Sequence, residues 1–217
     1  MKKLAVVIGA GRGMGNHIAA RFAKENFRVV LVARRQKLLD EYAAELSDKG
    51  CEVFARAADV SDTESLTKIF DDVQKNFGAV DVLIYNAAFM SGGRAAEISA
   101  AEAVAHFKVD VAGAIHCVQK ILPKQIERGE GAIIFTGGMF GVHPNANFEY
   151  ACMSMDKSAL RAPAQMLNAE LKDKGIFAGV VQIMGVVGSN KHFAPENIAE
   201  AYWKLYAEKN SFEYIFD

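Results

Sequence analysis

Short apolar segments alternate with longer amphipathic segments along the whole chain. The apolar segments are almost continuously hydrophobic, as expected of parallel strands that are buried on both faces. They predict strands at 4–9, 28–33, 51–57, 80–86, 132–136, 176–184 and 212–216. The segments between them predict helices at 14–26, 36–49, 62–77, 100–128, 149–174 and 195–209. This alternation predicts the α/β class: a doubly wound parallel sheet of about seven strands, with helices on both faces.

Length and composition predict one domain that spans residues 1–217. The 217 residues are enough for one well-buried α/β domain and few for two, and no linker or repeat divides them. The formal net charge of −1 gives no electrostatic reason to expect nucleic acid or an anionic membrane as a partner. No apolar run reaches the ~20 residues of a membrane span. We therefore expect a small-molecule substrate, with neither nucleic acid nor membrane as partner.

The cysteines and histidines predict no metal site and a reducing location. Cys51, Cys117 and Cys152 show no paired spacing, and the five histidines are scattered. The apolar run after Met1-Lys2-Lys3 is short and passes into a glycine-rich turn without a cleavage site, so we interpret it as the first strand. A cytoplasmic protein is the expectation.

A glycine-rich turn follows the first predicted strand and opens the first predicted helix. It reads Gly9-Ala10-Gly11-Arg12-Gly13-Met14-Gly15, with the spacing G-x-x-x-G-x-G. Glycines at such a junction permit a tight turn, and the helix N-terminus offers free N–H groups to phosphates. In a repeating βα chain this predicts a Rossmann-type dinucleotide site, and a mere flexible turn is the less favoured interpretation.

With this turn the chain resembles the short-chain dehydrogenase/reductase family over nearly its whole length. Other segments that match the family's cofactor site are Asp59-Val60 after the third strand, Asn86-Ala87 after the fourth, Lys157, and Gly185 to Val187 after the sixth. The resemblance implies that Lys157 holds the cofactor ribose. It also implies a homodimer or homotetramer formed through the helices near 100–128 and 149–174.

The end of the second strand predicts NADP(H) rather than NAD(H). An acidic residue there would bind the free ribose 2′-hydroxyl and repel a 2′-phosphate. The chain has Arg34 and Arg35 instead, and Arg12 in the glycine turn approaches from the other side. Two guanidinium groups suit a phosphate dianion. The alternative is that these arginines are solvated surface charges, which is more plausible for Arg35 than for Arg34.

The catalytic residues depart from the family's common pattern of Ser, Tyr and Lys. Four residues before Lys157, where most members have Tyr, this chain has Met153. The serine position falls in Thr136-Gly137-Gly138, and Asp110 stands where a supporting Asn is usual. Thr136 is a weak candidate for a substitute hydroxyl.

A second pattern fits better, because Tyr150 lies seven residues before Lys157 with Met153 between them. This spacing resembles the active site of the enoyl-thioester reductases, a divergent branch of the superfamily. Positions i and i+7 share a helix face, about 10.5 Å apart along the axis. We predict that Tyr150 stabilises the developing oxyanion and donates the proton, that Lys157 orients the cofactor, and that Phe140 walls the pocket. Alternatively, Tyr150 is a core aromatic at a helix start.

Three functions remain open from the sequence. The leading one is an NADPH-dependent reductase of a small carbonyl or α,β-unsaturated carbonyl compound. Only residues 186–195 follow the sixth strand before the last helix, so the substrate is small, the pocket is open or another subunit closes it. The missing serine favours a non-catalytic NADP(H)-binding sensor or assembly subunit instead. A structural protein with a vestigial site ranks last.

A few aromatic and histidine positions complete the expectations. Tyr202, Trp203 and Tyr206 are expected to pack the last helix onto the sheet, and His106 and His116 to face solvent or a subunit interface.

Overall fold

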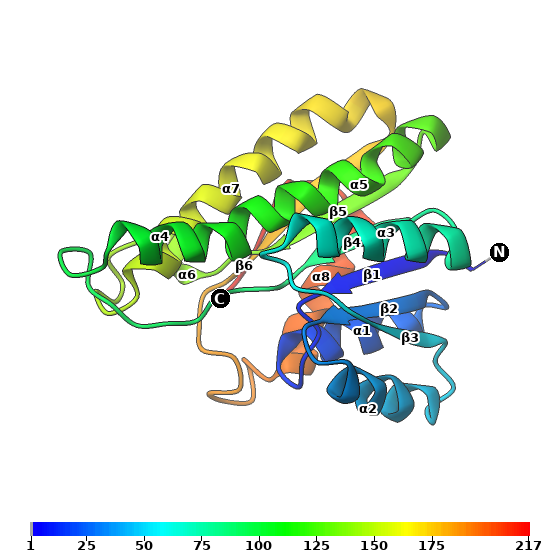
Figure 1. Cartoon of the computed structure of the whole chain (residues 1–217), viewed down its shortest axis with the longest axis horizontal. Helices are drawn as coiled ribbons and strands as arrows, with labels where there is room; N and C mark the ends of the chain where they lie inside the picture. The colour runs from blue at the N-terminus through cyan, green and yellow to red at the C-terminus, as the bar shows by residue number, and fades with distance from the viewer. Residues whose placement is uncertain (1) are drawn as a thin grey trace.

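The computed structural model describes residues 2–217 and shows a seven-stranded parallel sheet between two helical layers (Figure 1). The strand order is β3-β2-β1-β4-β5-β6-β7. The predicted fold class is confirmed. The order reverses between β1 and β4, so a crevice opens there at the carboxyl ends of the strands.

The strands match the predicted apolar segments closely. They are β1 (Leu4–Ile8), β2 (Arg28–Ala33), β3 (Val53–Ala57), β4 (Val82–Tyr85), β5 (Gly131–Thr136), β6 (Ile176–Ile183) and β7 (Glu213–Phe216). Every residue of β1, β4, β5 and β6 is buried, which explains why these segments lack alternation.

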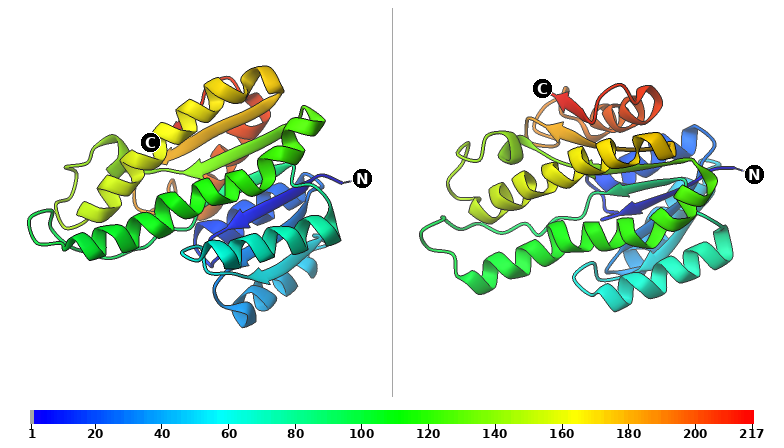
Figure 2. Two further views of the ribbon diagram at one scale, coloured as in Figure 1. Left: turned by 45° about the horizontal axis from the view of Figure 1, so that its top comes forward. Right: turned by 90° about the horizontal axis from the view of Figure 1, so that it is seen from above.

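The helices of the two layers bury separate clusters of apolar side chains. On one face lie α1 (Met14–Lys24), α2 (Gln36–Ser47) and α8 (Pro195–Glu208), and on the other lie α3 (Thr63–Phe77), α5 (Gly113–Arg128) and α7 (Ala151–Leu171), which ends in the short turn η2 (Lys172–Lys174) (Figures 1 and 2). Among residues 2–217, no helix has the length and apolar character needed to cross a bilayer.

The predicted helix at 100–128 is divided into three parts. These are α4 (Ala100–Phe107), the π-helical turn η1 (Lys108–Ala112) and α5. In η1 the carbonyl of Val109 accepts a hydrogen bond from the Tyr85 hydroxyl, and a Cβ on Gly113 would lie 2.5 Å from the Val60 carbonyl oxygen. Contacts of this kind interrupt the regular helical ladder, and π-turns are frequent at functional sites.

One end of the molecule extends beyond the carboxyl edge of the sheet. There α4, the short helix α6 (Met139–Val142) and the first turns of α7 come together (Figure 1). The sequence analysis did not predict α6. The candidate site lies between this end and the glycine-rich turn.

Candidate active site

The glycine-rich turn has the close backbone contacts that its sequence predicted. Gly9 has a φ of 86°, and a Cβ there would lie 2.4 Å from the backbone nitrogen of Ala87. A Cβ on Gly15 would lie 2.5 Å from the Gly9 carbonyl oxygen. Any larger residue at either position would push β1, β4 and α1 apart. Gly15 is therefore a packing residue.

Gly11 and Gly13 are different, because a Cβ on either would meet nothing within 4 Å. Both line the cleft described below. No side chain caps the N-terminus of α1, which begins at Met14. The first backbone N–H groups of α1 thus have no capping side chain, as an anion-binding helix start requires.

A cleft of about 1000 Å³ runs from this turn across the crevice of the sheet. Ten of the predicted cofactor residues line it: Gly9, Gly11, Gly13, Met14, Arg34, Asp59, Val60, Asn86, Ala87 and Val187. Arg12, Gly15, Gly185 and Lys157 do not line it. Gly185 is a packing position, since a Cβ there would lie 2.3 Å from the Phe193 ring.

Positive charge gathers at the end of the cleft nearest β2. Arg34 and Arg35 both line it, so the structure places Arg35 closer to the site than the sequence suggested. Asp59 accepts hydrogen bonds from the backbone and hydroxyl of Ser61. These bonds, with a smaller contribution from the charge of Arg34, hold the pKa of Asp59 below its usual range.

Several residues that line the cleft were missed by the sequence analysis. They are Leu38, Leu39 and Tyr42 of α2, Ser61, the segment from Ala88 to Met90, and Ala101, Val104, Ala105, Lys108 and Val109 of α4 and η1. Neither the family motif nor a spacing rule marks them. They come from helices and loops whose approach to the cleft depends on tertiary packing.

Tyr150 lies directly before the first residue of α7, whereas the sequence placed it within a helix at 149–174, and its backbone is not helical (φ −125°, ψ 48°). Its ring packs against Phe140 of α6, with centroids 5.4 Å apart. The side chain is partly buried. The predicted aromatic neighbour of Tyr150 is therefore in contact with it.

Lys157 is buried two turns further along α7. Its Nζ donates a hydrogen bond of 2.9 Å to the carbonyl oxygen of Thr136, at the end of β5. Burial lowers the pKa of Lys157, and the charges of Asp110 and Asp156 oppose this shift. A buried lysine with a weakened proton affinity is typical of functional sites.

The missing serine has a packing explanation in Gln182 of β6. A Cβ on Gly137 would lie 2.1 Å from Oε1 of Gln182, and the same oxygen accepts a 2.7 Å hydrogen bond from the Gly138 backbone. Gln182 in turn donates to Glu213, which accepts two bonds from Arg161. The two glycines therefore leave the space that this buried glutamine fills.

Thr136 does not act as a free hydroxyl. It donates to Oδ1 of Asn86 at 3.1 Å and lies 2.7 Å from the hydroxyl of Tyr202. Asn86 also donates to the Gly9 carbonyl. Thr136 thus fixes the position of Asn86 beside the glycine turn, and its hydroxyl, the weak candidate for a substitute catalytic group, is engaged in both of these hydrogen bonds.

The expectation for the last helix is partly correct. Tyr202 joins α8 to the sheet through Thr136. Trp203 and Tyr206 instead pack against Phe22 of α1 and against Phe27.

The prediction that His106 faces solvent or a subunit interface is wrong. His106 is 2% exposed, stacks on Phe89 and lies 3.8 Å from Asp156 through its Nδ1. His116 is partly buried and lies 3.0 Å from the Thr67 hydroxyl of α3. Both histidines serve contacts within the chain.

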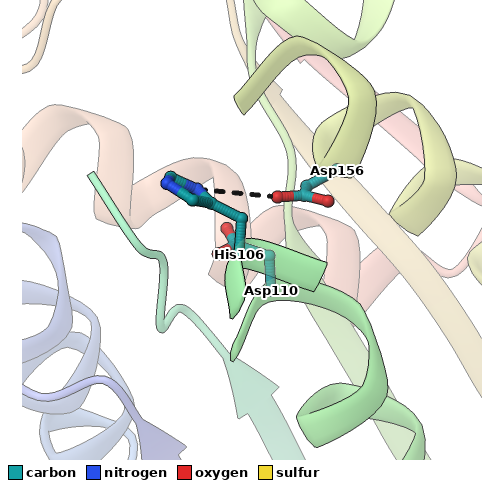
Figure 3. A group of neighbouring side chains, drawn as sticks. All are labelled: His106, Asp110 and Asp156. Carbon is teal, nitrogen blue, oxygen red and sulfur yellow. Dashed lines mark ion pairs between the residues drawn. The ribbon is translucent and has the colours of Figure 1, made fainter. Parts of the chain in front are cut away.

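His106, Asp110 and Asp156 form a buried cluster, which we call the acidic cluster (Figure 3). Asp110 accepts a 2.7 Å hydrogen bond from the Phe89 backbone, and burial raises its pKa. Burial and the charge of Asp110 raise the pKa of Asp156 to about 7. The sequence signal was present: His106 and Asp110 are four residues apart on one predicted helix, and Asp156 precedes Lys157.

Comparisons with known proteins agree with this geometry. The family model described as short chain dehydrogenase matches residues 3–195. An uncharacterized oxidoreductase of Staphylococcus aureus strain MW2 is 29% identical over 94% of this chain and 90% of its own length. The ketoacyl reductase HetN of Nostoc is 32% identical over 82% of this chain and 62% of its own.

Among solved structures, the alcohol dehydrogenase of the archaeon Thermococcus sibiricus, complexed with 5-hydroxy-NADP, has a TM-score of 0.87. It is 27% identical, and the match covers 99% of this chain and 96% of that one. A metagenomic short-chain oxidoreductase in complex with NADP has the same TM-score and identity, with 98% and 96% covered. The family match spans the glycine turn, Asn86 and Lys157, and the chain thus belongs to the short-chain dehydrogenase family as an oxidoreductase of that type.

Proposed function

We propose that this protein is an NADPH-dependent reductase of a small carbonyl or α,β-unsaturated carbonyl compound. The proposal is supported by a nucleotide-sized cleft in a chain that also has Tyr150 at the start of α7 and a buried Lys157 two turns further along it, although neither of these two residues lines the cleft. The solved NADP complexes of similar proteins support the choice of cofactor.

The residues present fit an NADP(H) molecule. Gly11 and Gly13 leave open space before the uncapped start of α1, where a pyrophosphate would bind. Arg34 and Arg35 line the end where a 2′-phosphate would lie, and Arg12 is exposed on the glycine turn. Asn86 and Val187 line the cleft further along and would contact the nicotinamide end.

Tyr150 and Lys157 have separate roles in the proposed hydride transfer. NADPH supplies a hydride when it is bound. Tyr150 hydrogen-bonds the substrate carbonyl oxygen and stabilises the negative charge that develops there. Lys157 holds the cofactor ribose, and its positive charge favours the ionised form of Tyr150. Phe140 keeps the Tyr150 ring in place.

The substrate of this site is small. The segment between β6 and α8 gives the cleft little cover, since Val187 lines it while Val186 is 69% exposed. A long acyl chain would therefore remain in contact with water, unless a second subunit covers it.

The test compares turnover of Tyr150→Phe with wild type on a panel of carbonyl and enoyl compounds. We expect kcat to fall by about 10²–10⁴-fold while the Kd of NADPH stays unchanged. Tyr206→Phe, which removes the hydroxyl of a tyrosine that does not line the cleft, is the matched control. Unchanged turnover in Tyr150→Phe would remove Tyr150 from the mechanism.

A parallel titration tests the cofactor. Arg34→Ala should weaken NADPH binding by about 10–100-fold, the worth of a lost charge-assisted bond, and leave NADH binding unchanged. Equal binding of both nucleotides by the wild type would exclude the preference for NADPH.

Met153 and Gly138 favour a second candidate, a sensor that binds NADP(H) without hydride transfer. It predicts tight NADPH binding with no turnover on the whole panel.

A further inference from the structure

The acidic cluster is buried, and nothing in the proposed mechanism uses it. His106 on α4, Asp110 on η1 and Asp156 on α7 are 2%, 1% and 3% exposed. One atom of each lacks a hydrogen-bond partner among residues 2–217: Nδ1 of His106, Oδ1 of Asp110 and Oδ2 of Asp156. Unsatisfied buried polar atoms are costly, and ligand atoms of these three residues lie within 4.8 Å of one another. The three side chains therefore need a common partner.

The imidazole of His106 is held so that one ring nitrogen stays free. Its Nε2 lies 2.6 Å from the Ser91 hydroxyl, and the ring stacks on Phe89 with an interplanar angle of 4°. When Nε2–H donates to Ser91, the lone pair of the neutral ring is on Nδ1, which points toward Asp156 (Figure 3). Histidine ligands of metal ions are oriented in this way, through a hydrogen bond from the ring nitrogen that does not bind the ion.

Each carboxylate also keeps one oxygen free. Oδ2 of Asp110 accepts a 2.7 Å hydrogen bond from the Phe89 backbone, which leaves Oδ1 without a partner. Oδ2 of Asp156 lies 3.8 Å from Nδ1 of His106, beyond hydrogen-bond distance. Two ligand atoms on one tetrahedral zinc ion are about 3.4 Å apart, so this pair is already close to ligand spacing. The widest pair in the cluster has to close by up to about 1.4 Å.

The charges of the acidic cluster favour a divalent cation. Two carboxylates and a neutral imidazole place two negative charges in a buried site, which is strongly unfavourable without compensation. Lys157 follows Asp156, but its Nζ donates to the Thr136 carbonyl, and no ion pair of the described residues joins it to the cluster. A divalent ion neutralises both carboxylates. When Lys157 is counted as well, the surplus positive charge favours hydroxide over water as a further ligand of the ion.

We propose that His106, Asp110 and Asp156 bind a divalent transition-metal ion through Nδ1, Oδ1 and Oδ2. One imidazole nitrogen and two carboxylate oxygens suit zinc and its neighbours, whereas Mg²⁺ and Ca²⁺ prefer oxygen ligands only. Three protein ligands leave one position of a tetrahedral ion to water or hydroxide. The ion joins α4, η1 and α7 beside the cleft, since Phe89 contacts His106 and also lines the cleft. In the metal-free protein a proton on Asp156 takes its place.

The segment 88–91 gives the ion a short path to this buried site. Ser91 is exposed and lies over His106, and Phe89 is 40% exposed. A movement of this segment alone uncovers Nδ1 of His106. The sequence predicted no metal site because it was searched for closely spaced ligands, whereas Asp156 reaches the site through the packing of α4 against α7.

The first test measures the binding of Zn²⁺ alone. The whole chain is freed of metal with a chelator, and Zn²⁺ binding is followed by calorimetry without NADPH or substrate. We expect wild type to bind one equivalent, and Asp156→Asn and His106→Gln to bind it about 100-fold more weakly or not at all. Such a loss exceeds the 10–100-fold cost of removing a group that only orients a ligand. His116→Gln removes an imidazole outside the cluster and should bind Zn²⁺ like wild type.

Ser91→Ala tests the orientation of His106 by a change at an exposed residue. We expect Zn²⁺ binding to weaken by about 10–100-fold, because the hydroxyl that fixes the imidazole is lost. The visible absorption of bound Co²⁺ should indicate four or five ligands in wild type and should disappear in Asp156→Asn. Circular dichroism shows whether each variant is folded. If Asp156→Asn does not fold, Ser91→Ala and its comparison with His116→Gln decide the question.

Thermal unfolding gives an independent readout. At a Zn²⁺ concentration about 100-fold above its Kd, we expect the Tm of wild type to rise by about 5–10 °C and that of Asp156→Asn to stay unchanged. Absence of Zn²⁺ binding by metal-free wild type would overturn the proposal. Binding that His106→Gln, Asp156→Asn and Ser91→Ala all retain would also overturn it, because the ion would then lie elsewhere on the protein. None of these measurements requires hydride transfer, so the proposed function stands or falls separately.

Discussion

At the scale of single residues, the site is defined by which groups are buried together. Lys157 and Tyr150 were proposed as a pair from their spacing in the sequence. The partners of Lys157 were only partly predictable. His106 and Asp110 share a helix face, but Asp156 comes from a helix some 50 positions later, and its approach depends on how α4 and α7 pack. Spacing rules reach one turn or two along a helix and do not describe such long-range contacts.

The raised pKa of Asp156 predicts a pH-dependent stability. The folded protein holds a proton on Asp156 up to about pH 7, whereas an unfolded aspartate releases it near pH 4. Between these values the folded state binds more protons, so the free energy of unfolding falls as pH rises. Asp110, whose pKa is also raised, acts in the same direction.

Asp156→Asn removes this dependence. We expect the variant to match wild type near pH 5 and to be more stable near pH 8, as measured by urea unfolding at both values. If the free energy of unfolding changed equally with pH in the two proteins, the raised pKa would not belong to Asp156.

At the scale of elements, the strands were predicted to within two residues at each end because buried parallel strands have an unmistakable apolar signature. The division of the predicted helix at 100–128 into α4, η1 and α5 was not predictable from an apolar pattern. The interruption at η1 depends on the Tyr85 hydroxyl and on the close approach of Gly113 to Val60, which are contacts from other elements. Likewise, Gln182 gives no sequence signal that it occupies the space beside Gly137.

Glu213 of β7 is joined through Gln182 to Gly137 and Gly138. We expect Glu213→Gln to lower the free energy of unfolding measurably. Bonds from Arg161 are the largest cause of the lowered pKa of Glu213. Their stabilisation is present above the unfolded pKa and is lost as pH falls through the folded one. We expect the variant to lose about 1–3 kcal/mol at pH 7 and less at low pH. Glu208→Gln, an exposed position on α8, is the control. An equal loss at both pH values would contradict the charge-based explanation.

At the scale of the whole molecule, α4, α6 and the start of α7 project past the sheet (Figure 2). Apolar side chains of the long helices α5 and α7 are exposed to solvent. Ile126 on α5 and Met155 and Met166 on α7 are 40%, 46% and 66% exposed. Exposed apolar residues gathered on neighbouring helices are typical of interaction surfaces. They support the expected homodimer or homotetramer.

Light scattering after size exclusion tests the assembly. We expect a dimer or tetramer for wild type and a smaller species for Met166→Glu, because a charge in an apolar interface is unfavourable. Val186→Glu changes an equally exposed apolar residue on a loop and should leave the assembly intact. A monomeric wild type would refute the expectation.

The measurement that tests the central claim most directly is hydride transfer itself. The protein is incubated with NADPH that carries deuterium at the transferable position and with each compound of the carbonyl and enoyl panel, and the products are analysed by mass spectrometry. The account predicts deuterium in the reduced product of at least one small compound, and its loss in Tyr150→Phe. Tight NADPH binding without deuterium in any product would contradict a reductase and favour the non-catalytic sensor.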